Sequence, residues 1–261
     1  MKKTIIAMMA LAGVAAADSI GYTDMTETQK NGVVLAWDFS SGSGSTVVGG
    51  GVTNSFTLTE DGYAKITGSG CPWTNSLTSS FDSGNFTLSF DLHGFNANNW
   101  QALVSLYSVG GHGDNKCLQI GVDTRGELSV FNEVAGQTGF ASIDTSGNLG
   151  TGLFSGFSGN STITLVSDMT DTKTLSVYVD GELVGSHANW TATTDQALMG
   201  LQIGASFGGG RGFPDATISD ITLWNKALTS SEINGLMVPE PTTATLSLLA
   251  LAGLAARRRR R

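Results

Sequence analysis

The feature of this sequence that most constrains its fold is a series of short segments in which apolar and polar residues alternate. Phe86–Leu92 (FTLSFDL) alternates without a break, and a period of two residues is the pattern of a β-strand with one buried face. We expect strands at 33–39, 55–58, 63–67, 86–92, 103–109, 117–122, 127–131, 162–166, 175–179, 182–184, 201–204 and 217–224. Because no helical periodicity lies between these segments, the sequence predicts one all-β domain, a β-sandwich or jelly roll.

The composition supports this fold class. Gly accounts for 35 of the 261 residues, whereas charged residues make up 14% and hydrophobic residues 40%. A disordered chain would combine few apolar residues with high net charge, and a coiled coil would be rich in Glu, Lys and Arg. Both classes are excluded, and many Gly-containing turns are expected.

Three local patterns predict how the strands are joined and closed. Asp180-Gly181 between two strands is typical of a two-residue type I′ hairpin turn. The alternation slips near Asp220, which predicts a β-bulge or an edge change in the last strand. Thr229 and Glu232 have the spacing of a capping box, with Thr229 as the N-cap of one short helix.

The N-terminus, residues 1–17, is predicted to be a secretory signal peptide. Lys2 and Lys3 precede an apolar stretch from Ile5 to Val14, and three Ala residues at 15–17 form a small-residue cleavage signature before Asp18. A buried N-terminal helix is the alternative, which both flanks disfavour.

The C-terminus, residues 239–261, has three parts. A Pro-Glu-Pro triplet is followed by an apolar run at 244–256 and an Arg cluster. Thirteen helical residues rise only about 20 Å, less than the ~30 Å hydrocarbon core of a membrane, so the tail is expected to be a transient membrane segment. The residues that define it are Pro239, Glu240, Pro241, Arg257, Arg258, Arg259, Arg260 and Arg261.

This tail resembles the PEP-CTERM sorting signal of Gram-negative bacteria. The resemblance implies recognition and cleavage by an exosortase in the inner membrane, after signal peptidase has removed the leader. It places the mature domain, residues 18–238, at the cell surface or outside the cell, with the membrane contacted only through the C-terminal segment before processing.

The mature domain is strongly acidic. Removal of both ends takes away seven of the 14 Lys and Arg residues but only one of the 22 Asp and Glu residues, which leaves a net charge of −14. A surface of that sign repels phosphate backbones, so nucleic acid is excluded as a partner.

Two cysteines, Cys71 and Cys117, are the only thiols of this chain. In an exported protein they are expected to form a disulfide, which would stabilise the fold by about 4 kcal/mol in the chain-entropy model. Two independently buried thiols are the alternative.

The strand pattern resembles that of LamG-like, concanavalin A-like jelly rolls. Residues 175–184 (LSVYVDGELV) resemble the YVDG hairpin of this family, and residues 213–233 resemble its closing strand and short helix. Phe86–Leu92 stands where the family has a strand containing Trp, but Asp91 replaces that Trp. The resemblance spans about residues 33–236 and implies a concanavalin A-like jelly-roll β-sandwich.

Catalytic patterns are missing. Glycoside hydrolases of this superfamily carry two acids on one strand face, in an E-x-D-x-x-E or E-x-D-x-E run, and no such run occurs. The spacing of a zinc site is also missing, since the three histidines, His93, His112 and His187, lie far apart in the sequence. Serine-nucleophile and phosphate-loop motifs are also absent. The sequence therefore predicts a protein that is not an enzyme.

Loops with aromatic and planar polar side chains favour sugar recognition, because aromatic faces stack on sugars and polar groups bind hydroxyls. An inward-facing core position is the alternative for Trp100. The candidate ligand-binding residues are Trp73, Asn99, Trp100, His112, Asp114, Asn189 and Trp190.

The fold resemblance also implies one structural calcium ion, and an acidic domain suits hard oxygen ligands. Asp38 and Asp220, on opening and closing strands, are the candidate ligands. Ordinary solvated carboxylates are the alternative.

Three functions follow from these patterns. The first is an exported, non-catalytic surface protein that binds a carbohydrate or an extracellular matrix polymer. The second is a structural or adhesive component of the extracellular polysaccharide layer without a discrete ligand site. A divergent glycosidase is the third, and the missing acid pair disfavours it.

Overall fold

The computed structural model describes residues 19–39, 45–49, 57–59, 64–65, 73–74, 77, 84–96, 101–107, 117–122, 128–132, 140–142, 158–188, 200–203 and 216–237. The predicted leader and the predicted C-terminal tail lie outside these residues. Among the described helices, none has both the length and the apolar character that a membrane span requires.

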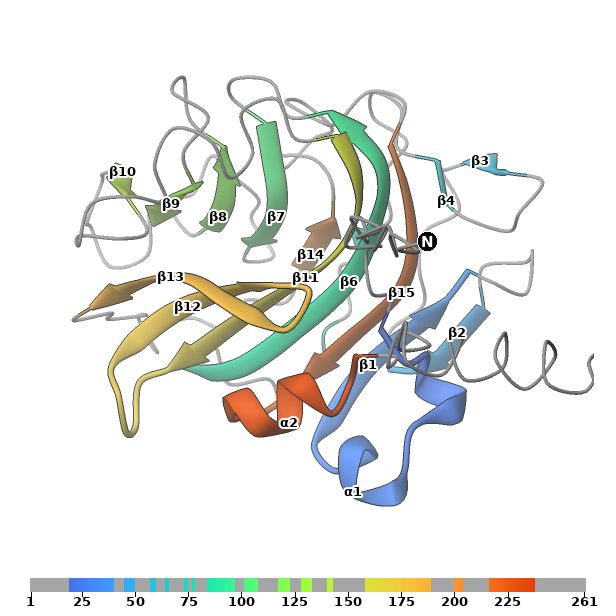
Figure 1. Cartoon of the computed structure of the whole chain (residues 1–261), viewed down its shortest axis with the longest axis horizontal. Helices are drawn as coiled ribbons and strands as arrows, with labels where there is room; N and C mark the ends of the chain where they lie inside the picture. The colour runs from blue at the N-terminus through green and yellow to red at the C-terminus, as the bar shows by residue number, and fades with distance from the viewer. Residues whose placement is uncertain are drawn as a thin grey trace, which may run out of the picture.

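Two antiparallel sheets form the domain, which confirms the predicted all-β sandwich (Figure 1). The larger sheet has the order β13-β12-β11-β6-β15-β1-β2, with β4 paired to β15 and β3 paired to β4. Its strands are β1 (Val33–Asp38), β2 (Ser45–Val48), β3 (Thr57–Leu58), β4 (Ala64–Lys65), β6 (Asn85–Asn96), β11 (Ser158–Asp168), β12 (Thr174–Val179), β13 (Glu182–Ala188) and β15 (Thr217–Trp224).

The smaller sheet has the order β10-β9-β8-β7-β14-β5. Its strands are β5 (Trp73–Thr74), β7 (Gln101–Tyr107), β8 (Cys117–Val122), β9 (Leu128–Asn132), β10 (Phe140–Ser142) and β14 (Gly200–Ile203). The described helices are the 3-10 helix η1 (Tyr22–Asp24), α1 (Glu27–Lys30) and α2 (Ser230–Asn234).

The main core lies between the two sheets. Phe86, Leu88, Phe90 and Leu92 all point from β6 into it, as the alternation predicts. The smaller sheet adds apolar residues from β7 and β14, including Val104 and Leu106 on β7. Apolar burial of this kind, worth roughly 25 cal/mol per Å², holds the two layers together.

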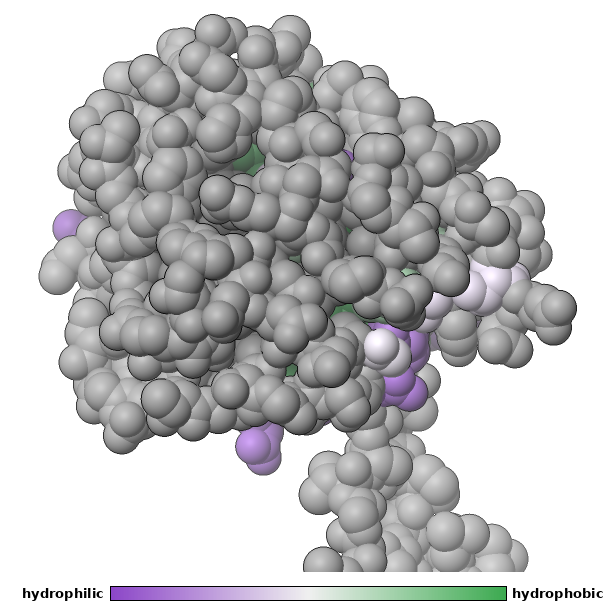
Figure 2. Space-filling model, turned by 90° about the horizontal axis from the view of Figure 1, so that it is seen from above, coloured by the Kyte–Doolittle hydropathy of each residue, from purple (hydrophilic) through white to green (hydrophobic). Residues whose placement is uncertain are grey.

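The opposite face of the larger sheet is buried as well. Trp224, Tyr178 and Val166 point away from the main core and pack with Leu228, Ile233 and Leu236, which come from the α2 region. Figure 1 shows α1 and α2 on the side of the larger sheet that faces away from β7–β10. In Figure 2, small green areas mark the described apolar residues that are visible in this view.

This second buried face corrects one expectation. The alternation in Phe86–Leu92 predicted a strand with one solvent-facing side, but Thr87, Ser89 and Asp91 are buried too. The prediction was wrong because polar residues at alternate positions reach water only when nothing covers that face, and here the two ends of the domain cover it.

The predicted turn and bulge are confirmed. Asp180 and Gly181 have φ values of 52° and 82°, and positive φ at both central residues defines a type I′ turn. The pairing of β15 with β6 shifts between Ser219 and Ile221, where Asp220 has a φ of 21°.

Three short strands were not predicted. β2, β5 and β10 lie in segments rich in Gly, Ser or Thr, or beside Pro72. Each pairs with a longer neighbour, β1, β14 and β9 respectively. Their strand structure therefore depends on that partner more than on their own sequence.

Candidate functional site

Of the predicted ligand-binding residues, Trp73 alone lies within the described part of the chain. Asn99, Trp100, His112, Asp114, Asn189 and Trp190 lie outside the described residues. Trp73 begins β5, which pairs with β14 at the edge of the smaller sheet. For the predicted disulfide, Cys117 begins β8, whereas Cys71 lies outside the described part of the chain.

The strand order shows where these candidate segments attach. The 97–100 connection enters β7 at Gln101, and the 108–116 connection leaves β7 after Tyr107. These two points are opposite ends of one strand, about 20 Å apart at 3.3 Å per residue. Residues 189 and 190 follow β13, an edge strand of the other sheet. The topology therefore attaches the candidate segments at separate places on the domain.

The two candidate calcium ligands lie on neighbouring strands, as predicted. β1 pairs with β15 up to Trp37↔Ile221, and Asp38 and Asp220 are the next residues beyond that pair. Calcium prefers six to eight oxygen ligands. No group of three or more His, Cys, Asp or Glu side chains that could hold a metal ion occurs within the described ranges. The structure thus confirms that Asp38 and Asp220 lie on adjacent strands, and their role as calcium ligands stays a prediction.

The most unusual group in the described structure is the carboxylate of Asp91. It lies near the middle of the larger sheet on the outer face and is 1% exposed. The Ser19 N–H donates to both of its oxygens at 3.2 and 3.3 Å, and the Ser19 hydroxyl donates to Oδ2 at 3.0 Å. From β11, the Thr162 hydroxyl donates to Oδ1 at 2.5 Å.

Burial raises the pKa of Asp91 from 3.8 to about 7, because removal from water penalises the charged form. The hydrogen bonds from Thr162 and Ser19 act in the opposite direction, and the nearby carboxylate of Asp220 adds a further increase. Its hydrogen-bond donors are all uncharged groups. Asp91 is therefore a buried acid whose charge is opposed by its surroundings.

Other polar side chains extend this region along the outer face. His93 Nε2 and the Ser219 hydroxyl lie 2.9 Å apart, and both groups are buried. The hydroxyls of Ser89 and Thr164 also lie 2.9 Å apart. We call Ser19, Asp91, His93, Thr162, Ser219 and Asp220 the polar region. Its buried groups are hydrogen-bonded, as stable interiors require.

The N-terminal segment covers the polar region and is fixed there by the other end of the domain. Ile20 N–H donates to the Leu236 carbonyl at 2.7 Å, and Ser19 forms an isolated antiparallel bridge with Met237. A Cβ on Gly21 would lie 3.2 Å from Asp220 Oδ1. The segment therefore approaches the Asp220 carboxylate so closely that Gly21 has little room for a side chain.

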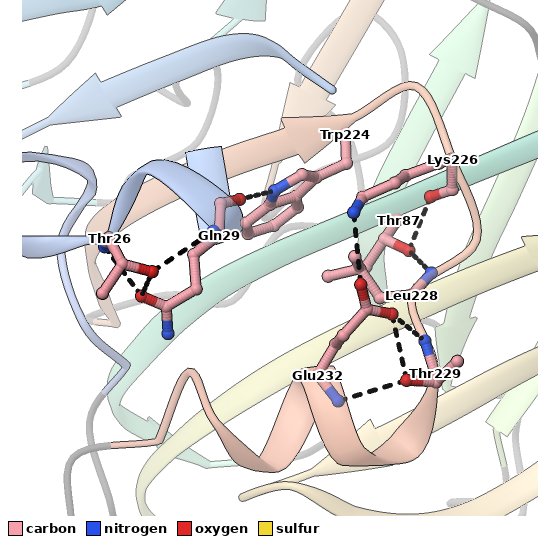
Figure 3. A network of polar contacts seen from close by, with 8 residues as sticks. All are labelled: Thr26, Gln29, Thr87, Trp224, Lys226, Leu228, Thr229 and Glu232. Carbon is pink, nitrogen blue, oxygen red and sulfur yellow. Dashed lines mark hydrogen bonds and ion pairs between the residues drawn. The ribbon is translucent and has the colours of Figure 1, made fainter. Parts of the chain in front are cut away.

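A second network joins the two short helices to the sheet (Figure 3). The Trp224 indole N–H donates to the Gln29 carbonyl at 2.7 Å. The Thr87 hydroxyl donates to the Lys226 carbonyl at 3.0 Å and accepts from the Leu228 N–H at 2.9 Å. These bonds connect α1 to β15, and β6 to the segment before α2.

Both helices begin with capping boxes. The predicted one is confirmed: Thr229 accepts from the Glu232 N–H at 3.2 Å, and Glu232 accepts from the Thr229 N–H at 2.8 Å. Thr26 and Gln29 form the same arrangement at the start of α1, which was not predicted. The Thr-x-x-Gln spacing was available in the sequence as its signal.

The sequence did not predict that the polar region forms. It names Asp220 as a candidate calcium ligand, and Asp91 stands out only as a departure from the family pattern. A charged residue at the centre of an alternating strand is the signal that could have suggested a buried partner, but it does not reveal that the partner is Ser19, 72 residues away.

As arranged here, Asp91 cannot act on a bound substrate. Ser19 and Thr162 occupy its oxygens and it has almost no exposed surface. A general acid must lie within hydrogen-bond reach of the atom that it protonates. In this conformation the polar region joins parts of the chain to each other.

Comparison with known families gives one match. Residues 58–234 match the model of a family described as the concanavalin A-like lectin/glucanases superfamily, of the laminin G type. The match begins at the second residue of β3 and includes all later strands of the described structure. Only β1 and β2 lie wholly before it. A search of curated proteins found no match.

Solved structures share the fold at low identity. The ligand-binding domain of botulinum neurotoxin serotype D, in complex with N-acetylneuraminic acid, is 13% identical with a TM-score of 0.56, over 78% of this chain and 50% of that one. A structure of botulinum neurotoxin type C, from work on its interaction with two ganglioside molecules, is 14% identical. Its TM-score is 0.54, over 81% of this chain and 52% of that one. The sialidase of Trypanosoma rangeli is 20% identical, with a TM-score of 0.52 over 78% and 32%. This chain thus spans between a third and a half of those chains.

Proposed function

The chain belongs to the concanavalin A-like lectin/glucanase superfamily, and from this premise we propose that it is an exported, non-catalytic surface protein that binds a glycan. The observation that carries the proposal is the two-sheet fold, which it has in common with solved structures that hold sialic acid or concern gangliosides. The identity to those structures is low, so the class of ligand is proposed and the particular sugar is not.

The non-catalytic part of the proposal is supported by the missing E-x-D-x-x-E or E-x-D-x-E run in the sequence and by the covered position of Asp91. A glycosidase needs two carboxyl groups that flank the scissile bond, about 5 Å or 6.5–9.5 Å apart according to mechanism. Asp91 is the only fully buried acid among the described residues, and Ser19 covers it.

The proposed sugar contacts are the loop residues Trp100, His112 and Trp190 with their polar neighbours, together with Trp73 on β5. Because the connections that contain them attach at separate places, we expect Trp190, beyond the edge strand β13, to act independently of Trp100. A calcium ion held by Asp38 and Asp220, with further oxygens from the chain, is part of the same proposal.

Export is the second part of the proposal, and the sequences of the two terminal segments support it. Signal peptidase would remove residues 1–17, and an exosortase would process the tail at 239–261. The protein would then reside at the cell surface or in the extracellular polysaccharide layer, after transient anchoring in the inner membrane.

A glycan array tests this function. The processed domain, residues 18–238, is applied with calcium and again with a chelator, and saturable binding to at least one glycan is expected. Trp190→Ala should weaken that binding. Leu183→Ala is the matched control, because Leu183 is an apolar residue, 56% exposed, on β13, the strand that precedes Trp190 in the sequence.

The other outcomes also decide between functions. No saturable binding to any glycan would contradict the proposal and favour a structural role in the polysaccharide layer. Release of the reporter group from synthetic glycosides would contradict the non-catalytic part and favour a glycosidase.

A further inference from the structure

The buried carboxylate of Asp91 needs an explanation that sugar binding does not give. A charged group transferred from water into a protein interior is strongly unfavourable unless an opposite charge accompanies it. Its hydrogen-bond donors, from Ser19 and Thr162, are uncharged, and the nearest acid, Asp220, carries the same sign. A cation is the group that this arrangement would accommodate best.

The chain itself can supply that cation next to Ser19. The Ser19 nitrogen lies 3.2 Å from Asp91 Oδ1. Three backbone bonds separate the nitrogens of consecutive residues, so these nitrogens are at most about 3.7 Å apart. The nitrogen of residue 18 must therefore lie within about 7 Å of the Asp91 carboxylate whenever Ser19 makes this contact.

In the unprocessed chain that nitrogen is a neutral amide. Hydrolysis of the Ala17–Asp18 bond consumes one water molecule and leaves a carboxylate on Ala17 and an amine on Asp18. The amine takes up a proton at neutral pH, because an α-amino group has a pKa of about 7.7–8.0. Leader cleavage thus creates one positive charge beside a buried negative one.

We propose that Asp91, with Asp220 beside it, is the docking site for the α-ammonium group that leader cleavage creates at Asp18, so that processing of the N-terminus completes the fold. The inference rests on the export that is part of the proposed function. It does not depend on sugar binding.

The position of the N-terminal segment supports this docking. Its contacts with Leu236 and Met237 hold Ser19 over β6 and β15 independently of Asp91. The close approach of Gly21 to Asp220 brings the same segment against the second carboxylate. The raised pKa of Asp91 applies to the chain in which residue 18 is still joined through an amide. A neighbouring ammonium group would favour the charged form of Asp91.

The experiment compares two forms of the chain 18–261 that differ only in one acetyl group. In one form the α-amine of Asp18 is free, and in the other it is acetylated, with mass spectrometry to confirm both. Urea unfolding at pH 7 gives the unfolding equilibrium constant of each. We expect acetylation to raise that constant by about tenfold or more, because it leaves Asp91 without its ion partner.

Asp91→Asn provides the decisive comparison. In this variant acetylation should change the unfolding constant by less than about twofold, because the charge that the ammonium meets has been removed. If Asp91→Asn does not fold, Asp220→Asn is used, and there the effect of acetylation should be reduced. Asp171→Asn is the matched control, since Asp171 is an exposed acid in the turn between β11 and β12.

Two results would overturn the proposal. One is an effect of acetylation that is the same in the parent chain, Asp91→Asn and Asp171→Asn. The other is an exported protein whose N-terminus, read by mass spectrometry, is not Asp18. A glycan array without hits would contradict the proposed sugar binding and leave both of these measurements unchanged.

Discussion

The outer face of the larger sheet is divided into two regions that are equally buried but chemically opposite. On one, Trp224 and Tyr178 pack beneath Ile233 of α2. On the other, Asp91 and Ser219 lie beneath the N-terminal segment. Burial therefore has different effects in the two regions. Apolar area removed from water stabilises the fold directly, whereas the hydrogen bonds of a buried polar group at best offset the cost of its desolvation. We expect the apolar region to determine stability and the polar region to determine how stability depends on conditions.

The largest expected effect tests the apolar region. Trp224→Ala should lower the free energy of unfolding by about 3–5 kcal/mol, because it removes a fully buried indole and leaves a cavity under α2. Urea denaturation followed by circular dichroism measures the change. Trp224→Phe is the matched variant: it keeps a ring but loses the bond to Gln29, and it should cost about 1–2 kcal/mol. A loss below 1 kcal/mol for Trp224→Ala would mean that this region is not a stabilising core.

The polar region should respond to pH instead. The folded-state pKa of Asp91, about 7, is raised above its unfolded value of 3.8. The folded chain therefore holds this proton more tightly, so the contribution is fully present below about pH 4 and is lost as the pH rises towards 7. In the form with an acetylated Asp18, the loss should approach about 4 kcal/mol.

Other groups titrate near Asp91, so the measurement needs a reference. His93 lies on the same face of β6 as Asp91, and Asp220 lies on β15. Asp180 lies in the turn between β12 and β13, and its carboxylate accepts a hydrogen bond from the Thr162 N–H. In the form with an acetylated Asp18, urea unfolding of the parent sequence and of Asp91→Asn at several pH values isolates the contribution of Asp91 as the difference. Parallel pH profiles for the two proteins would show that Asp91 keeps an ordinary pKa.

The smallest effects concern the two capping boxes, which sharpen the comparison within the helical cover. Thr229→Ala should cost about 1 kcal/mol, since it removes the cap of α2, the helix that contributes buried Ile233. Thr26→Ala should cost about 0.5 kcal/mol, because α1 contains no buried residue. Thermal unfolding of both variants measures the order. A larger loss for Thr26→Ala than for Thr229→Ala would show that α1 contributes more to the stability of the fold than α2.

Local features of this fold were predictable where neighbours in the sequence determine them. The Asp180-Gly181 turn, the bulge at Asp220 and the Thr229 cap each depend on a few adjacent residues, and all three are confirmed. The inner face of β6 was predictable for the same reason, because alternation alone places Phe90 in the core.

Features that depend on distant partners were not predictable. The burial of Asp91 requires Ser19, and the role of α1 requires the contact between Trp224 and Gln29, 195 residues apart. A four-residue helix has little intrinsic stability, so its sequence signal is weak until the packing partner is known. The candidate sugar contacts at Trp100 and Trp190 stay predictions, because loops are placed by their surroundings rather than by periodicity.

The bridge between Ser19 and Met237 brings the two ends of the described domain side by side. A short peptide could therefore join them without crossing the sandwich, and the chain could be reopened at the exposed Thr170–Lys173 turn between β11 and β12. Domains whose ends meet in this way tolerate circular permutation and insertion into a host loop. The same geometry would allow this domain to be displayed as an insert on another scaffold.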